Sequence, residues 1–236
     1  MNSTGVEALF DQTCASGYDQ MQSRLAPLRD VLHLLTGVIL SELPADARVL
    51  CVGAGTGTEL IALAERFPGW HFTAVEPSSP MLDACRRKLE ASGLAARCAL
   101  HGGYLDSLPA LAPFDAATAL LVSQFVLDPA ARRGFFRGIG ERLRPGGWLV
   151  SADLAADTGA PAYQSLLEVW WRVMRNADVS PDDVERMRQA YERDVAVLPP
   201  DAVAGLIASG GFETPVPFLQ TGLIHAWYAR WPGACT

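Results

Sequence analysis

The fold of the chain is decided by residues 48–60, which read RVLCVGAGTGTEL. The pattern predicts a buried strand, a turn with glycines at positions 53, 55 and 57, and the first turn of a helix. Glycine has no Cβ, so the backbone of such a turn can approach a bound ligand closely. Its amides and the following helix N-terminus favour a negative or acceptor-rich ligand group. The stretch therefore predicts a ligand-binding strand–turn–helix unit.

The glycine spacing narrows the kind of ligand. The dinucleotide fingerprint has Gly-x-Gly-x-x-Gly, whereas this turn has Gly-x-Gly-x-Gly and carries Thr58 where the last glycine would stand. This spacing and the long segment before the turn argue against a nicotinamide oxidoreductase. We expect a ligand whose amino-acid end lies along the backbone. A turn with a purely structural role is the alternative.

The second predicted strand ends in a carboxylate, Glu76. Residues 70–76 read WHFTAVE and predict a second strand that ends in Glu76, about twenty residues past the glycines. A carboxylate at this end of the strand can accept both hydroxyls of a ribose. The alternative is a solvated charge at a strand end.

Five stretches of the chain resemble the class I S-adenosylmethionine-dependent methyltransferases, and they cover about residues 45–155 plus the C-terminal region. The stretches are VLCVGAGTG at 49–57, VEPSSPML at 75–82, GGYLDSLP at 102–109, LRPGGWLV at 143–150, and GFE at 211–213 with FLQ at 218–220. The resemblance implies S-adenosylmethionine as cofactor and S-adenosylhomocysteine as product. It also implies a Rossmann-like α/β fold, a doubly wound and mostly parallel seven-stranded sheet with an antiparallel C-terminal strand.

The same resemblance implies where the cofactor lies. We expect the methionine part along the glycine turn, the ribose at Glu76, the adenine between the second and third strands, and the sulfonium end at the fourth strand. An arginine or histidine of the lead segment would pair with the cofactor carboxylate. The expected cofactor-binding residues are Gly53, Ala54, Gly55, Gly57, Glu76, Pro77, Met81, Gly103, Tyr104, Leu120, Leu121, Arg24 and Arg29, with His33 as a further partner for the carboxylate.

Several of these positions have alternatives, and the arginines of the lead helix could simply be solvated charges. Met81 could be a core residue of its helix. Many members of the resembled family carry Asp where this chain has Gly103, so the adenine amino group would be recognised by the backbone or by Asp106.

The lead segment resembles the subgroup that contains the carboxy-S-adenosylmethionine synthases. Those enzymes need an arginine for the additional carboxylate, and the nearest position here is Tyr191, with Arg188 and Arg193 close by. Methyl transfer is therefore preferred over carboxyl transfer. A non-catalytic domain that binds the cofactor as a sensor or partner is a further alternative.

We expect the acceptor site to be built by the lead segment and by a helical insertion at residues 154–198. The expected substrate-binding residues are Tyr18, Gln124, Tyr163, Trp170, Trp171 and Tyr191. Their aromatic character favours a planar or apolar small molecule. Alternatively, the tryptophans seal the insertion onto the sheet.

Methyl transfer from a sulfonium needs mainly positioning and desolvation, because the methyl group is already activated. No general base is assigned, although His33, Asp153 and His225 are candidates. No histidine shows metal-ligand spacing, so we expect no metal.

The bulk composition fits this interpretation. The chain has 236 residues, which suits one domain with a helical lead at 1–44. A net charge of −7 argues against a nucleic-acid footprint. Five cysteines without a Cys-x-x-Cys pair, no signal-peptide pattern and no long apolar stretch predict a soluble cytoplasmic protein without a membrane partner. The oligomeric state is left open, with a homodimer as one option.

The alternation of apolar patterns predicts strands near 48–53, 70–76, 96–101, 115–122 and 147–153, and a closing antiparallel hairpin near 212–220 and 223–231. Helices are expected near 57–67, 79–92, 129–143 and 201–209, besides the lead helix and two helices in the insertion.

Overall fold

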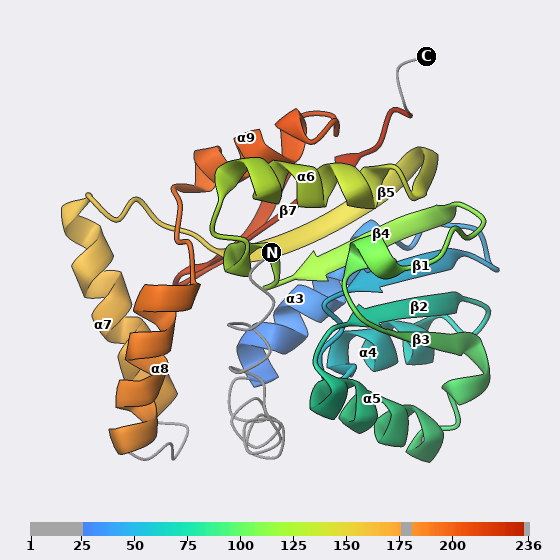
Figure 1. The fold of residues 1–236 in the computed structure, drawn as a ribbon, viewed down its shortest axis with the longest axis horizontal. Coiled ribbons are helices and arrows are strands. Elements are labelled where there is room, and N and C mark those ends of the chain that lie inside the picture. Colours follow the sequence, from blue (N-terminus) through green and yellow to red (C-terminus); the bar gives the residue numbers. More distant parts are fainter. Residues whose placement is uncertain (1–25, 176–180, 234–236) are drawn as a thin grey trace.

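A computed structural model describes residues 26–175 and 181–233 of the chain. Seven strands form one sheet in the order β3-β2-β1-β4-β5-β7-β6 (Figure 1). Every strand pair is parallel except the pairs that β7 makes with β5 and β6, so the doubly wound sheet with an antiparallel strand at the C-terminal side is confirmed. The strands are β1 Arg48–Val52, β2 His71–Glu76, β3 Cys98–Gly102, β4 Phe114–Leu120, β5 Leu143–Leu154, β6 Val216–Thr221 and β7 Ile224–Arg230.

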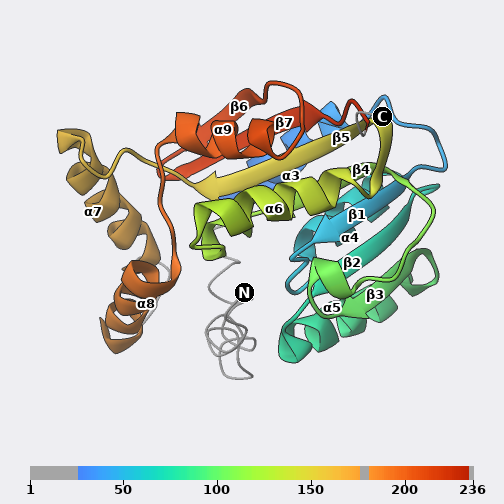
Figure 2. The ribbon, with the colours of Figure 1, turned by 45° about the horizontal axis from the view of Figure 1, so that its top comes forward.

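Helices cover both faces of the sheet (Figures 1 and 2). One face carries α3 Ala26–Ile39, α4 Thr58–Arg66 and α5 Ser79–Ala91. The other face carries α6 Pro129–Gly140 and α9 Pro200–Ser209. Each face has its own apolar core: Leu60 and Leu63 of α4 belong to one, and Phe136 and Ile139 of α6 belong to the other. Burial on both faces explains why the central strands are apolar throughout.

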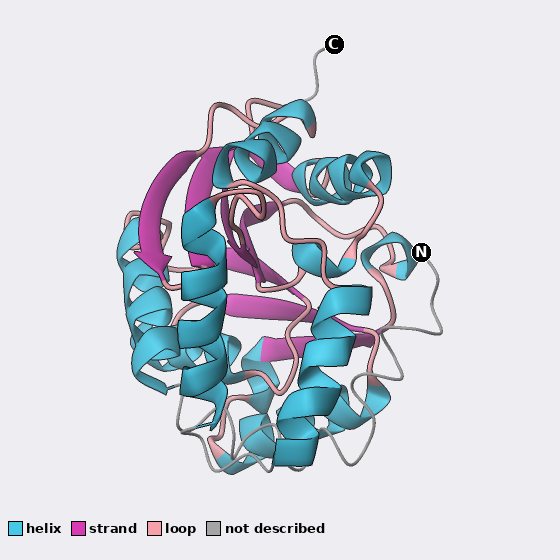
Figure 3. Ribbon diagram, turned by 90° about the vertical axis from the view of Figure 1, so that its left-hand side faces the viewer, coloured by secondary structure: helices cyan, strands magenta, loops and turns pink. Residues whose placement is uncertain are grey.

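The predicted insertion forms two helices, α7 Pro161–Arg175 and α8 Pro181–Asp194. They lie beyond the end of β5, at the left of Figure 1, and Figure 3 looks onto this end of the sheet. Parallel strands bring their carboxyl ends to one edge, which is where ligands of such sheets bind. The insertion therefore stands at the edge where a site is expected.

Local sequence signals explain where two helices begin. The hydroxyl of Ser78 accepts a hydrogen bond from the Met81 amide at 3.4 Å and caps α5. The carboxylate of Asp128 accepts one from the Ala131 amide at 2.8 Å and caps α6. A proline occupies the first turn in both helices, as the sequence pattern predicts.

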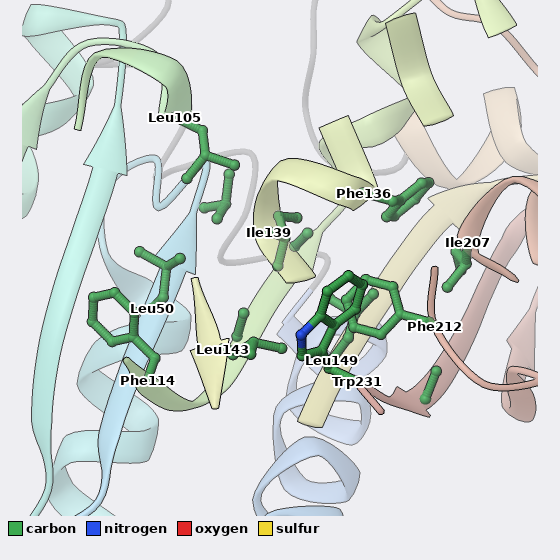
Figure 4. Close-up of a cluster of buried hydrophobic side chains, with 14 of the residues drawn as sticks. Leu50, Leu105, Phe114, Phe136, Ile139, Leu143, Leu149, Ile207, Phe212 and Trp231 are labelled. Atoms are coloured by element: carbon green, nitrogen blue, oxygen red, sulfur yellow. The ribbon is translucent and has the colours of Figure 1, made fainter. Parts of the chain in front are cut away.

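One boundary differs from the sequence prediction. Helix α6 ends at Gly140 instead of residue 143, and β5 begins at Leu143 instead of residue 147. Leu143 pairs with Phe114 across a register shift between β4 and β5, and it packs with the core under α6 (Figure 4). A buried position in an irregular strand gives the same apolar signal as the end of a helix, so periodicity alone does not separate the two.

A search for helices with the length and apolar character of a membrane span, made over the described ranges, finds none.

Candidate functional site

The glycine turn lies at the carboxyl end of β1. Gly53, Gly55 and Gly57 all have positive φ, at 67°, 55° and 82°. A Cβ on Gly53 would lie 2.4 Å from Val122, and one on Gly57 would lie 2.5 Å from the sulfur of Cys85. A Cβ on Gly55 would meet nothing within 4 Å. Packing within the chain thus requires two of the glycines, whereas Gly55 faces open space.

Glu76 connects the ends of β1 and β2. Its Oε2 accepts a hydrogen bond from the Gly55 amide at 2.9 Å, and its Oε1 accepts one from the Ser78 amide at 2.9 Å. A carboxylate offers about four acceptor positions, so each oxygen keeps capacity for another donor. Burial raises the pKa of Glu76, and the two amides offset part of the rise. The arrangement suits a diol held against the glycine turn.

The loop after β3 lies beside the same carboxylate. The amide of Gly103 donates to the Glu76 carbonyl at 3.1 Å, and Tyr104 is half-buried. Pro77 is half-buried as well, whereas Met81 is only 2% exposed and presents little surface to a ligand. These residues therefore gather next to the turn, with Met81 in the layer beneath.

The end of β4 forms the opposite side of the site. Leu121 has a φ of 59°, a conformation that costs a non-glycine residue roughly 1–3 kcal/mol. Its amide donates to the Ala152 carbonyl at 2.7 Å, and its side chain packs with the apolar cluster of the insertion. Leu120 packs toward Leu32 of α3. The two leucines thus connect the strand end to the insertion and to the lead helix.

Helix α3 supplies the polar groups on its face of the sheet. Arg29 pairs with its exposed neighbour Asp30 at 3.1 Å. Burial, with the Arg29 charge as a second cause, lowers the pKa of His33 to about 4, so its ring is neutral at neutral pH. Tyr18 and Arg24 lie outside the described residues.

Asp153 is completely buried at the end of β5. Its carboxylate accepts hydrogen bonds from the Ser123 hydroxyl at 2.7 Å and the Gln124 amide at 2.9 Å, and it forms an ion pair with Arg132 of α6 at 3.3 Å. Burial raises the pKa of Asp153, and the Arg132 charge opposes the rise. This geometry suits a structural anchor better than proton exchange with a bound molecule.

The hydrogen-bond network around Asp153 also includes Ala196, in the segment that follows α8. Arg132 donates to the Ala196 carbonyl at 3.1 Å, and the Ala196 amide donates to the Gln124 carbonyl at 2.8 Å. The side-chain oxygen of Gln124 accepts from the Leu154 amide at 2.7 Å. Gln124, an expected substrate contact, is thus 4% exposed and engaged in holding the insertion.

Two of the three candidate bases lie together, and the third lies on the other face of the sheet. His225 is the register partner of Asp153 across β5 and β7 and stacks on Trp227 at 6.0 Å. Trp227 belongs to the core under α6 and α9, so His225 and Asp153 lie on that face of the sheet. His33 lies on α3, on the other face. Burial lowers the pKa of His225.

The aromatic residues of the insertion divide into two groups. Trp171 and Tyr191 are buried and pack edge to face at 5.6 Å, against Leu223 and Ile224 between β6 and β7. Burial raises the pKa of Tyr191, whose hydroxyl lies 3.4 Å from that of Tyr163. These rings seal the insertion onto the sheet. A second group, Tyr163 and Trp170, is half-buried and keeps surface for another molecule.

Sequence reasoning missed Arg132 and Glu59. Arg132 stands four residues before Phe136, on the apolar stripe of α6, so its place in the helical period was the available signal. Glu59 occupies the first turn of α4, and nothing in its spacing marks it. Over the described ranges, no cluster of three or more histidine, cysteine, aspartate or glutamate side chains is arranged to hold a metal ion.

Comparison with known proteins adds independent information. A methyltransferase-domain family model matches residues 49–147. The carboxy-S-adenosyl-L-methionine synthase of Campylobacter curvus is 25% identical over 86% of both chains. The trans-aconitate 2-methyltransferase of Streptomyces coelicolor is 31% identical over 86% of this chain and 61% of that protein. An O-methyltransferase family protein from Burkholderia thailandensis superposes with a TM-score of 0.60, at 17% identity, over 94% of this chain and 63% of that one.

Proposed function

We propose that this chain, which belongs to the class I S-adenosylmethionine-dependent methyltransferases, transfers a methyl group to a small-molecule acceptor. The observation that carries the proposal is the pairing of Gly55 with Glu76. The glycine leaves open space beside the turn, and the neighbouring carboxylate has free acceptor positions that would accept the hydroxyls of a ribose. A nucleoside that also carries an amino-acid chain matches both features.

The residues that would hold the cofactor lie on three neighbouring strand ends. The turn at 53–57 would bind the amino-acid chain, and Glu76 would accept the ribose hydroxyls. Pro77, Gly103 and Tyr104 would flank the adenine. When bound, S-adenosylmethionine supplies a methyl group that is activated by the sulfonium.

The task left to the protein is to place the acceptor and to exclude water. The half-buried rings of Tyr163 and Trp170, together with Leu121, would provide an apolar wall for a planar or apolar acceptor. Orientation and desolvation then account for most of the rate enhancement. Asp153 is held by Arg132, Ser123 and the Gln124 amide, so we do not assign it as a base.

Carboxylation of the cofactor itself is a second candidate. It is favoured by the Campylobacter curvus synthase, to which the chain is similar over nearly its whole length. The residue at the position where those enzymes are expected to carry an arginine is Tyr191, which is buried between Trp171 and Tyr163. We therefore rank this candidate below methyl transfer.

The test combines binding and turnover. Calorimetry of the full chain should give tight binding of S-adenosylhomocysteine and no binding of NAD. Incubation with methyl-labelled cofactor and a panel of acceptors that includes trans-aconitate and planar phenols should transfer label to at least one acceptor. Mass spectrometry of co-purified ligand separates the two candidates, because a carboxylated cofactor would favour the synthase. Absence of S-adenosylhomocysteine binding would overturn the proposal.

A further inference from the structure

One corner of the sheet has no helix of the described ranges over one of its faces. A helix joins β1 to β2, β2 to β3 and β4 to β5, whereas the connection from β3 to β4 contains only the short 3-10 helix Leu105–Ser107. Phe72 of β2 and Cys98 of β3 pack in the core under α4, so alternation turns their neighbours His71 and Ala99 to the other face, where both are exposed. Parallel sheets are normally covered on both faces, so this bare corner needs an explanation.

A hollow of about 290 Å³ opens at this corner, and we call it the amino-edge hollow. It lies at the amino ends of β1, β2 and β3, at the right of Figure 1, whereas the glycine turn and the insertion lie at the carboxyl ends of the strands. Its lining includes Arg48, His71, Thr73 and Arg97, and none of the described residues that line it is acidic. The amino-edge hollow is therefore separate from the candidate cofactor site and has a positive lining.

Arg48 brings one guanidinium group to the hollow. Its Cζ lies 5.1 Å from the centre of the Phe114 ring, and its Nη1 donates to the Ala112 carbonyl at 2.8 Å. The ring and this hydrogen bond hold the group in place and leave other N–H donors for a ligand. The carboxylate of Asp115 accepts the backbone amide of Arg48 at 2.6 Å and pairs with Arg144 at 2.7 Å, so its charge is already engaged.

Arg97, the residue before β3, brings a second guanidinium group. It donates to the carbonyls of Ala64 and Trp70 at 2.8 Å each and to that of Phe67 at 3.3 Å, at and just after the end of α4. These bonds fix the group, but the carbonyls are neutral and do not cancel its charge. No aspartate or glutamate of the described ranges forms an ion pair with Arg48 or Arg97. Two fixed and uncompensated cations at one hollow favour an anionic ligand.

We propose that the amino-edge hollow binds a phosphate group, held by the guanidinium groups of Arg48 and Arg97. Arginine matches the oxygens of phosphate with paired N–H donors, and a dianion balances two positive charges. His71 is the register partner of Arg48, and Thr73 lies two residues further on the same strand face, so both would supply additional donors. The inference does not depend on the proposed function, because the two sites lie at opposite edges of the sheet.

The test is a titration of the full chain with inorganic phosphate, followed by phosphorus NMR at an ionic strength held constant with sodium chloride. Line broadening should saturate at one phosphate per chain. Arg48→Met should weaken binding by at least about tenfold, because it removes a charge-assisted contact. Arg133→Met removes an exposed arginine of α6 and should bind phosphate like wild type. Acetate carries a single charge and should compete at least about tenfold more weakly than phosphate does.

A second pair of variants changes the charge of the hollow and keeps both arginines. Ala99 is exposed and lines the hollow, so a longer side chain fits there without disturbing the core. Ala99→Glu should abolish phosphate binding, because its carboxylate pairs with the arginines and repels the anion. Ala99→Gln has the same shape without the charge and should retain phosphate affinity within about threefold. This pair decides the question even if Arg48→Met does not fold.

The remaining outcomes are equally clear. Broadening that does not saturate in wild type overturns the inference, as does equal phosphate affinity of wild type and Ala99→Glu. Equal competition by acetate refutes the choice of phosphate as the ligand group. Ribose 5-phosphate is the second probe, because it carries the same group on a larger molecule. Tighter binding of this probe than of inorganic phosphate assigns the hollow to a phosphorylated metabolite, and weaker binding assigns it to free phosphate.

Discussion

Oε2 of Glu76 accepts a hydrogen bond from the amide of Gly55 at 2.9 Å, so the last residue of β2 is tied directly to the glycine turn after β1. The other oxygen accepts the Ser78 amide at the start of α5. One carboxylate therefore fixes the relative position of two backbone segments that border the site. Its role in shaping the turn and its proposed role in binding ribose use different lone pairs of the same two oxygens.

Glu76→Gln should weaken both the site and the fold. A glutamine has one acceptor oxygen, so its amino group would face a backbone N–H and leave that donor unsatisfied at a cost of about 1–3 kcal/mol. We expect urea unfolding to show a stability loss of that order and calorimetry to show a roughly 10- to 100-fold loss of S-adenosylhomocysteine affinity. Glu90→Gln, an exposed position on α5, should change neither.

Affinity should also depend on pH through Glu76. Burial raises the pKa of this carboxyl group in the folded protein. A protonated carboxyl accepts fewer hydrogen bonds, so S-adenosylhomocysteine affinity should fall as the pH drops through the raised pKa. Burial also raises the pKa of Glu59, in the first turn of α4, to about 7, so the profile is measured in the Glu59→Gln background as well. A profile that stays flat in both backgrounds would contradict a carboxylate contact.

Gly55→Leu should abolish cofactor binding, because the leucine side chain would occupy the space of the ligand. A leucine at a second glycine, Gly93, separates this steric effect from the effect of backbone strain. Gly55 and Gly93 both have a left-handed φ, at 55° and 68°, and neither has a neighbour within 4 Å of its Cβ position. Leucine at either site should cost about 1–2 kcal/mol of stability. Only the substitution at Gly55 should remove S-adenosylhomocysteine binding in calorimetry. If both variants bind equally well, the ligand does not lie against the turn.

The sheet and its order of helices could be predicted from the sequence because the signals are local. The apolar run of β1, the glycine turn and the Ser78 cap each act within a few residues. The side of the sheet on which a strand-end residue lies could not be predicted in this way. Asp153 and His33 were both candidate bases for the same reaction, yet they lie on opposite faces of the sheet. Their placement follows from the register of β5 and the packing of α3, which no short window contains.

The partners of a buried charged side chain could not be predicted from the sequence either, because they come from distant parts of the chain. Arg132 reaches Asp153 from 21 residues away in sequence, and Glu59 meets Thr118 across the layer between α4 and β4. A side chain on an apolar stripe predicts burial, but the group that compensates its charge depends on the tertiary fold. The cofactor side of the site was therefore accessible to sequence reasoning, and the buried network behind it was not.

Arg132→Met should destabilise the protein strongly. Removal of one member of a buried ion pair leaves the other charge uncompensated, at a cost of about 3–5 kcal/mol. Asp153→Asn should cost a similar amount in urea unfolding, and the double variant should lose less than the sum because no lone charge remains. Arg137→Met, which breaks the exposed pair with Glu141 on the same helix, should cost less than about 1 kcal/mol. A stable Asp153→Asn protein that had lost turnover would instead identify Asp153 as a base.

His33 should make the protein less stable in mild acid. Its pKa is lowered from 6.5 to about 4 in the folded chain, because burial penalises the charged ring. As the pH falls from 6.5 toward 4, the unfolded chain takes up this proton first, so stability is lost over that window and the loss ends below it. Between about pH 7.5 and about pH 5 the expected contribution is up to about 2 kcal/mol. Urea unfolding of His33→Gln at both pH values should show a smaller acid loss than wild type by this amount. His71→Gln, at an exposed position, should follow wild type, and an unchanged acid loss in His33→Gln would show that folding does not lower the pKa of His33.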